Sequence, residues 1–127
     1  MIERGDAVPH FNVRGLTGQP LSYAAVWQRS NLLLVATPHT DDQSMRQFVS
    51  QLTARASELS ALQTELVATR DVIAGLPQGG VLIADRWGEI VHVVHASAPD
   101  DLPTVDDLLD WLEHLQSRCP ECEGETK

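Results

Sequence analysis

The chain has 127 residues, 43% of them hydrophobic and 21% charged, which is the composition of one globular domain with an ordinary core. Its formal net charge of -9 argues against nucleic acid and anionic membranes as partners, because both attract basic surfaces. The sequence has no apolar run of the about 20 residues that span a membrane and no signal-peptide-like stretch at its start, so we expect a cytoplasmic protein.

The N-terminal part predicts an extended arm in front of the main domain. Residues 8–13 suggest an extended segment, and Gly15 and Gly18 supply a turn. Residues 21–27 fit a short helix. The continuous apolar run 31–36 then predicts a strand that is buried on both faces of a parallel or mixed sheet.

A helix and a second strand follow this buried strand. Asp41 or Asp42 can cap the helix. Apolar residues then recur at spacings of three and four, as on one face of a helix: Met45, Phe48, Val49, Leu52, Ala56 and Leu59. Residues 66–69 predict the next strand, although residues 65 and 66 could instead prolong the helix.

The C-terminal half predicts a hairpin and a final helix. Strands at 81–84 and 90–94 flank a short loop, in which Gly88 can adopt positive φ. Thr104, with Asp107 three residues later, resembles a helix start. The apolar face of this helix consists of Val105, Leu108, Leu109, Leu112 and Leu115. We predict one domain over residues 1–118 and a short acidic tail over 119–127.

Three segments carry motifs whose order and spacing resemble one family. Residues 5–11 (GDAVPHF) match G-D-x-x-P-x-F, residues 16–21 (LTGQPL) resemble a D-G-x-x-hydrophobic turn, and residues 82–90 (LIADRWGEI) match a strand-D-x-x-G-x-hydrophobic hairpin. These motifs are similar to those of the redoxins, the peroxiredoxin and alkyl hydroperoxide reductase/thiol-specific antioxidant group. The resemblance covers residues 4 to about 115. It implies a thioredoxin-like α/β fold, with a mixed central sheet flanked by helices, a redoxin-type N-terminal arm and oxidoreductase chemistry.

The resemblance also implies where an active site lies. In peroxiredoxins, P-x-x-x-T-x-x-C places the attacking cysteine in the first turn of a helix, whose positive N-terminus stabilises the thiolate. Here Pro38 matches the proline, but Asp42 replaces the threonine and Met45 replaces the cysteine. Gly79 stands where the family has a cis-proline or an arginine, and the connection 69–81 is too short for the family's helix. We expect a redoxin-like protein without the usual peroxidatic cysteine and without peroxidase activity at this position.

The two cysteines allow three interpretations. Cys119 and Cys122 form a C-x-x-C, which in a cytosolic chain indicates thiol–disulfide exchange, although the acidic surroundings should raise the thiol pKa. With His114 they give H-x4-C-x2-C, a partial zinc site that needs a fourth ligand. As free thiols in a disordered tail, they would leave a non-catalytic thioredoxin-fold module that binds another protein. We expect no cofactor apart from this possible zinc, and a protein partner or a homodimer.

Two further polar groups have structural interpretations. Four residues lie near the predicted start of the first helix: His39, Asp41, Asp42 and Ser44. They could perform acid–base chemistry or bind a cation, but helix capping explains them more simply. His92 and His95 lie in the second hairpin strand and should point to opposite faces of the sheet, so we expect both to have an edge-strand role.

Overall fold

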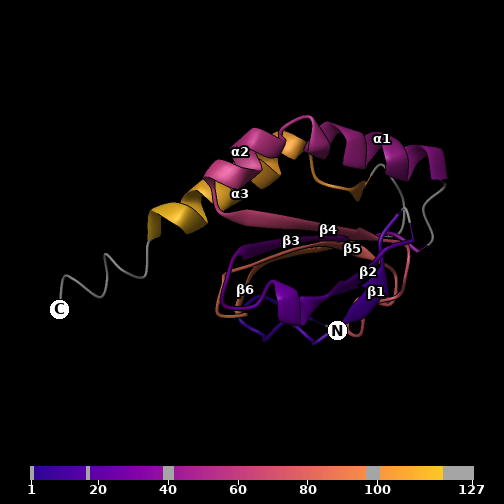
Figure 1. Ribbon diagram of the computed structural model, residues 1–127, viewed down its shortest axis with the longest axis horizontal. Coiled ribbons are helices and arrows are strands. Elements are labelled where there is room, and N and C mark those ends of the chain that lie inside the picture. Colours follow the sequence, from indigo (N-terminus) through magenta and orange to yellow (C-terminus); the bar gives the residue numbers. More distant parts are fainter. Residues whose placement is uncertain (1, 17, 39–41, 97–100, 119–127) are drawn as a thin grey trace.

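The computed structural model describes residues 2–16, 18–38, 42–96 and 101–118 (Figure 1). Its strands are β1 (Asn12–Arg14), β2 (Pro20–Ser22), β3 (Asn31–Ala36), β4 (Thr64–Thr69), β5 (Gly80–Ala84) and β6 (Ile90–His95). Its helices are the 3-10 turn η1 (Tyr23–Ala25) and the α-helices α1 (Asp42–Thr53), α2 (Ala56–Ala61) and α3 (Val105–Arg118). None of the helices in these ranges is long and apolar enough to cross a membrane.

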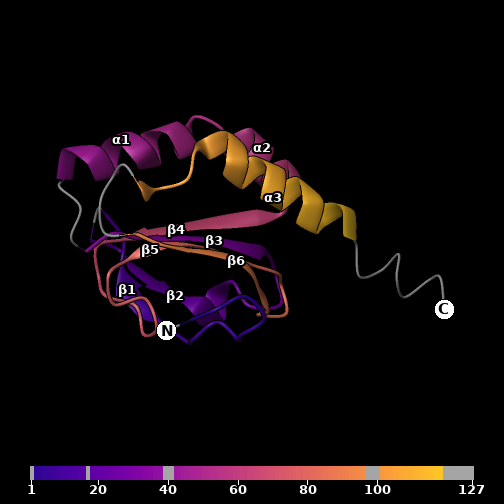
Figure 2. The ribbon, with the colours of Figure 1, turned by 180° about the vertical axis from the view of Figure 1, so that it is seen from behind.

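The central sheet is mixed and has the strand order β4-β3-β5-β6. β3 runs parallel to β4 and antiparallel to β5, and β5 and β6 form the predicted antiparallel hairpin. Every residue of β3 is buried, which confirms the prediction of a strand covered on both faces. The α-helices cover one face of the sheet, whereas the arm of β1, β2 and η1 covers the other (Figures 1 and 2).

The two-residue period of a strand explains the two layers of core on either side of the sheet. Leu33 and Val35 point toward the α-helices, while Leu32 and Leu34 point toward the arm. On the arm side, the core includes four residues of the N-terminal segment: Ile2, Val8, Phe11 and Val13. The arm is therefore part of the hydrophobic core.

Hydrogen bonds hold the N-terminal segment against distant parts of the chain. The N–H of Ile2 donates to the Gly75 carbonyl oxygen at 2.9 Å, and the N–H of Gly5 donates to the Ile90 carbonyl oxygen at 2.8 Å. His95 Nε2 lies 2.8 Å from the Ile2 carbonyl oxygen. Since a carbonyl oxygen only accepts hydrogen bonds, this ring nitrogen carries the proton.

Two predicted elements differ from those in the structure. Leu21 is in β2, opposite Val13, so the helix predicted over 21–27 is reduced to the short turn η1. The long helix predicted after Asp42 breaks between Thr53 and Ala56. Arg55 at this break binds Glu58, and its Nη1 lies 3.1 Å from Asp106 Oδ1 of α3. The apolar spacing of the sequence continues through this break and does not indicate it.

The other predicted elements agree with the structure, with small shifts at their ends. β4 begins at Thr64, so residues 65 and 66 belong to the strand and do not prolong the helix. Gly88 has a φ of +91° in the hairpin loop. The Thr104 hydroxyl accepts a hydrogen bond from the N–H of Asp107 at 3.1 Å, as a helix cap does. Residues 70–79, all of them described, contain no helix, as the length of this connection predicts.

Candidate functional site

The positions that the redoxin resemblance assigns to an active site lie where β3 leads into α1. We call this place the β3–α1 site, defined by Pro38, Asp42, Met45 and Gly79. Pro38 is half-buried directly after β3, and Asp42 is the first residue of α1. The Asp42 side chain, together with His39 and Asp41, lies outside the described residues, so the capping and acid–base interpretations stay predictions.

Met45 occupies the first turn of α1 and is almost completely buried, with 1% of its surface exposed. Its Sδ lies 3.9 Å from Nη1 of Arg70, which donates to the thioether. A positive charge therefore stands beside the sulfur, as a reactive thiolate would require. A thioether has no proton to lose, so Met45 cannot act as that nucleophile.

The sequence interpretation missed Arg70. It directly follows β4, and β4 lies next to β3 in the sheet, so the two strands end side by side at the β3–α1 site. The only signal that could have indicated Arg70 was the expected pairing of these two strands, which brings the residue after β4 to the end of β3.

Gly79 packs against the end of β3 and has a φ of +90°. A Cβ at this position would lie 2.5 Å from the Ala36 carbonyl oxygen and 2.8 Å from Pro38 Cδ. The Gly79 N–H donates to the Leu76 carbonyl oxygen at 3.0 Å. The structure thus brings Gly79 and Pro38 together, and only a residue without a side chain fits between these backbone segments.

Thr37 follows the last residue of β3, and Thr69 is the last residue of β4. Within the described residues, only the Thr69 hydroxyl has hydrogen bonds. The Thr69 hydroxyl donates to the Arg14 carbonyl oxygen at 2.7 Å and accepts from the Asp71 N–H at 3.0 Å. Thr37 is 1% exposed, and its hydroxyl has no partner among the described residues. A buried hydroxyl without a partner opposes folding.

We predict opposite effects for the two matched variants Thr37→Val and Thr69→Val. Thr37→Val should leave the free energy of unfolding unchanged or raise it by up to about 1 kcal/mol, because it removes an unpaired polar group. Thr69→Val should lower it by about 1–2 kcal/mol, because the Arg14 carbonyl oxygen and the Asp71 N–H each lose a partner. Urea unfolding of both variants measures the difference. Equal losses would mean that the Thr37 hydroxyl is hydrogen-bonded in solution.

His114, the C-terminal candidate that the structure describes, lies far from the β3–α1 site. The end of α3 and the start of α1 are at opposite ends of the molecule (Figure 1). His114 is exposed on α3, and its ring centroid lies 6.3 Å from that of Trp111. Cys119 and Cys122 lie outside the described residues. Within the described part of the chain, no three His, Cys, Asp or Glu residues gather in a way that could hold a metal.

His92 and His95 point to opposite faces of β6, as predicted. His92 stacks on Trp111 of α3, with ring centroids 4.3 Å apart and planes inclined by 14°. Burial, together with the charge of Arg4, lowers the pKa of His92, and Asp107 offsets part of this shift. β6 is an edge strand, and these contacts tie it to the α3 layer on one face and to the N-terminal segment on the other.

A second cluster, which the sequence interpretation missed, surrounds the β5–β6 hairpin loop. Asp85 is 9% exposed, and its Oδ1 accepts hydrogen bonds from the N–H groups of Trp87 and Glu89, each at 2.9 Å. The nearby Tyr23 hydroxyl is buried and has no partner in the described ranges. Burial, with a smaller effect from Asp85, raises the pKa of Tyr23.

Two tryptophans beside this loop are exposed to solvent. Trp27 is 40% exposed and Trp87 is 55% exposed. Trp27 Nε1 donates to the Trp87 carbonyl oxygen at 3.4 Å, and the His10 ring lies edge-on to Trp27. We call His10, Trp27 and Trp87 the tryptophan patch. Large exposed aromatic side chains are typical of surfaces that contact other molecules.

Comparisons with known proteins identify the fold. No protein-family profile matches the chain, and no curated protein sequence matches it. Among solved structures, the reduced 2-Cys peroxiredoxin of Plasmodium vivax superimposes with a TM-score of 0.70 at 10% identity, over 91% of this chain and 97% of that chain. Peroxidoxin BcpB of Mycobacterium tuberculosis gives a TM-score of 0.67 at 12% identity, over 90% and 98%.

A third structure extends the likeness to the wider thioredoxin class. The thioredoxin domain of a thiol-disulfide oxidoreductase from Bacteroides vulgatus has a TM-score of 0.63 at 12% identity and covers 91% of this chain and 99% of that chain. The chain therefore has a thioredoxin-like α/β fold of the kind found in peroxiredoxins, which confirms the fold implied by the sequence motifs.

Proposed function

We propose that this chain is a redoxin-like protein that has no peroxidase activity at the β3–α1 site and whose only thiol–disulfide chemistry resides in Cys119 and Cys122. The observation that carries the proposal is the burial of Met45 beside Arg70, at the position where the resemblance places a reactive cysteine. Gly79, whose backbone packs on Ala36, gives further support, because this position has no room for a proline ring.

The reaction assigned to the cysteines is a two-electron exchange. Cys119 and Cys122 lose two protons and two electrons as they form a disulfide, and either a peroxide is reduced to water and an alcohol or a partner's disulfide is reduced to two thiols. The acidic residues between and after the cysteines should keep the thiols protonated at neutral pH and so slow this reaction.

A peroxide assay tests the proposal. With a thiol reductant, peroxide turnover should not exceed that of free cysteine at the same thiol concentration, because no activated thiolate is expected. After exposure to peroxide, mass spectrometry should show a loss of about 2 Da from the intact chain, which is the mass of the two hydrogens lost on disulfide formation. A saturable peroxidase rate that survives Cys119→Ser combined with Cys122→Ser would contradict the proposal, because it requires a different nucleophile.

The tryptophan patch favours a second candidate function, in which the domain binds another protein without catalysis. Trp27 and Trp87 both have exposed side chains, the Trp27 indole bonds the Trp87 backbone, and tryptophan is enriched at protein interfaces. Thiols that stay free after peroxide treatment would favour this module over the redox protein. Zinc binding by His114, Cys119 and Cys122, a homodimer and a cytoplasmic location stay predictions from the sequence.

A further inference from the structure

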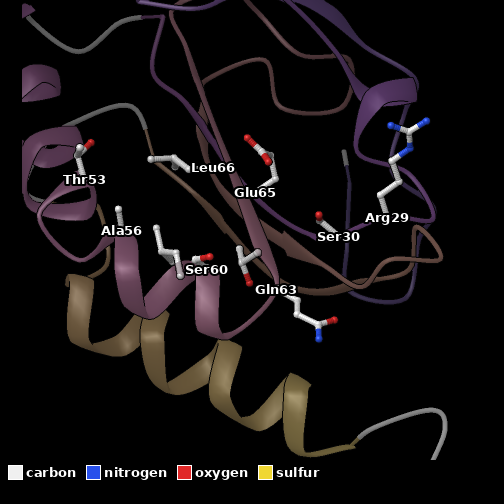
Figure 3. Close-up of a pocket in the computed structure, with 10 residues that line it drawn as sticks. Arg29, Ser30, Thr53, Ala56, Ser60, Gln63, Glu65 and Leu66 are labelled. Atoms are coloured by element: carbon white, nitrogen blue, oxygen red, sulfur yellow. The ribbon is translucent and has the colours of Figure 1, made fainter.

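A pocket of about 450 Å³ lies between α2 and the edge strand β4 (Figure 3). Its polar lining includes four hydroxyl side chains, those of Ser30, Thr53, Ser60 and Thr64. Arg29 and Thr53 stand at opposite ends of the pocket. This volume is in the range of pockets that hold small ligands or peptide side chains.

The last turn of α3 lies beside this pocket. Gln116 Oε1 accepts a hydrogen bond from Asn31 Nδ2 at 3.2 Å, and the same amide donates to the Leu62 carbonyl oxygen at 3.1 Å. The N–H of Asn31 donates to the carbonyl oxygen of Gln63, which itself lines the pocket. α3 ends only two residues after Gln116. α3 therefore ends at the Ser30 and Gln63 side of the pocket.

The charges of this segment and of the pocket rim are complementary. Residues 119–127 read CPECEGETK and contain three glutamates and one lysine. The exposed Arg29 lines the pocket, and the nearby Arg86 hydrogen-bonds Gln63. Glu65 is the one acidic residue in the lining, and it lies apart from Arg29 (Figure 3). Nine extended residues span up to about 30 Å, so the segment can cross the pocket.

We propose that the pocket between α2 and β4 is the docking site of the chain's own C-terminal segment, residues 119–127, held by its glutamates at Arg29. A short tether gives an effective concentration on the order of 1 mM, so even a weak contact is occupied. The docking rests on geometry and charge alone and does not depend on the redox role.

A spin label on the chain tests this proposal. A nitroxide is attached to Cys122 in a Cys119→Ser background, and the amide signals of the ¹⁵N-labelled protein are recorded. We expect the signals of Ser60 and Thr64 to lose intensity, in addition to those at the end of α3 and of Ser30 beside it. They should recover in Arg29→Glu and in salt on the order of 1 M, where the Debye length is about 3 Å.

Matched controls separate the possible occupants. Arg46→Glu carries the same charge reversal on α1, away from the pocket, and should leave the intensity losses unchanged. Broadening confined to the end of α3 would overturn the proposal. A second control mixes ¹⁵N-labelled protein that carries no nitroxide with unlabelled protein that carries it. The same intensity losses in this mixture would also overturn the proposal, because they would show that a second copy fills the pocket. None of these outcomes requires thiol reactivity, so failure of the docking is distinguishable from failure of the redox function.

Discussion

A Gly79→Pro variant should lose about 3 kcal/mol or more of its free energy of unfolding. Proline fixes φ near −65°, whereas Gly79 has a φ of +90°. Proline also removes the N–H that Gly79 donates to the Leu76 carbonyl oxygen. In addition, a Cβ would lie 2.5 Å from the Ala36 carbonyl oxygen. A proline at this position therefore requires residues 76–80 to be rebuilt.

Urea unfolding of three variants separates these causes. Gly79→Ala keeps the N–H, but its Cβ also clashes with the Ala36 carbonyl oxygen and it needs the same unfavourable φ. Its free energy of unfolding should therefore fall by less than that of Gly79→Pro. Gly5→Ala has a similar φ of +94° in open space and should lose only about 1 kcal/mol, the cost of the backbone conformation alone. A Gly79→Pro variant as stable as Gly5→Ala would mean that the segment before β5 rearranges freely.

An Asp85→Ala variant should lose about 2–3 kcal/mol of its free energy of unfolding. The carboxylate accepts two backbone hydrogen bonds, from Trp87 and Glu89, and both donors would lose a charged partner. The pKa of Tyr23 should also fall, because Asp85 contributes to raising it, but it should stay above its ordinary value, because burial is the larger cause. Urea unfolding and an absorbance titration of the phenol measure the two effects.

Asp85→Asn is the matched control for this prediction. Its amide oxygen can still accept both hydrogen bonds, so the loss of stability should be clearly smaller than in Asp85→Ala. The negative charge is absent from both variants, so the pKa of Tyr23 should fall equally in both. A fall in only one of them would show that a structural change near Tyr23, and not the charge, is responsible.

The sheet was predictable because its signals are local. The apolar run 31–36 and the hairpin loop ending at Gly88 each depend on a few neighbouring residues, and both agree with the structure. Leu21 was assigned to the wrong element, because its place opposite Val13 depends on pairing within the arm. The break between Thr53 and Ala56 was missed, because the apolar spacing continues through it to Leu59.

The candidate site was predictable only in part, for the same reason. The motif spacing indicated Met45 and Gly79. The structure places Met45 in the first turn of α1 and Gly79 against the end of β3. It could not indicate Arg70 beside the Met45 sulfur, because that contact depends on β4 lying next to β3. Similarly, only the three-dimensional surroundings reveal that the Thr37 hydroxyl has no partner among the described residues.

The attachment of the N-terminal segment has a consequence for synthesis on the ribosome. Ile2 is bound to Gly75 and to His95, and the latter contact spans 93 residues. At roughly 5–20 residues per second, the first segment waits on the order of 4 to 20 s before its partners are made. During that time Val8 and Phe11, both core residues in the finished fold, lack their burial site. The nascent chain should therefore be a better client for chaperones that bind apolar segments than the completed protein.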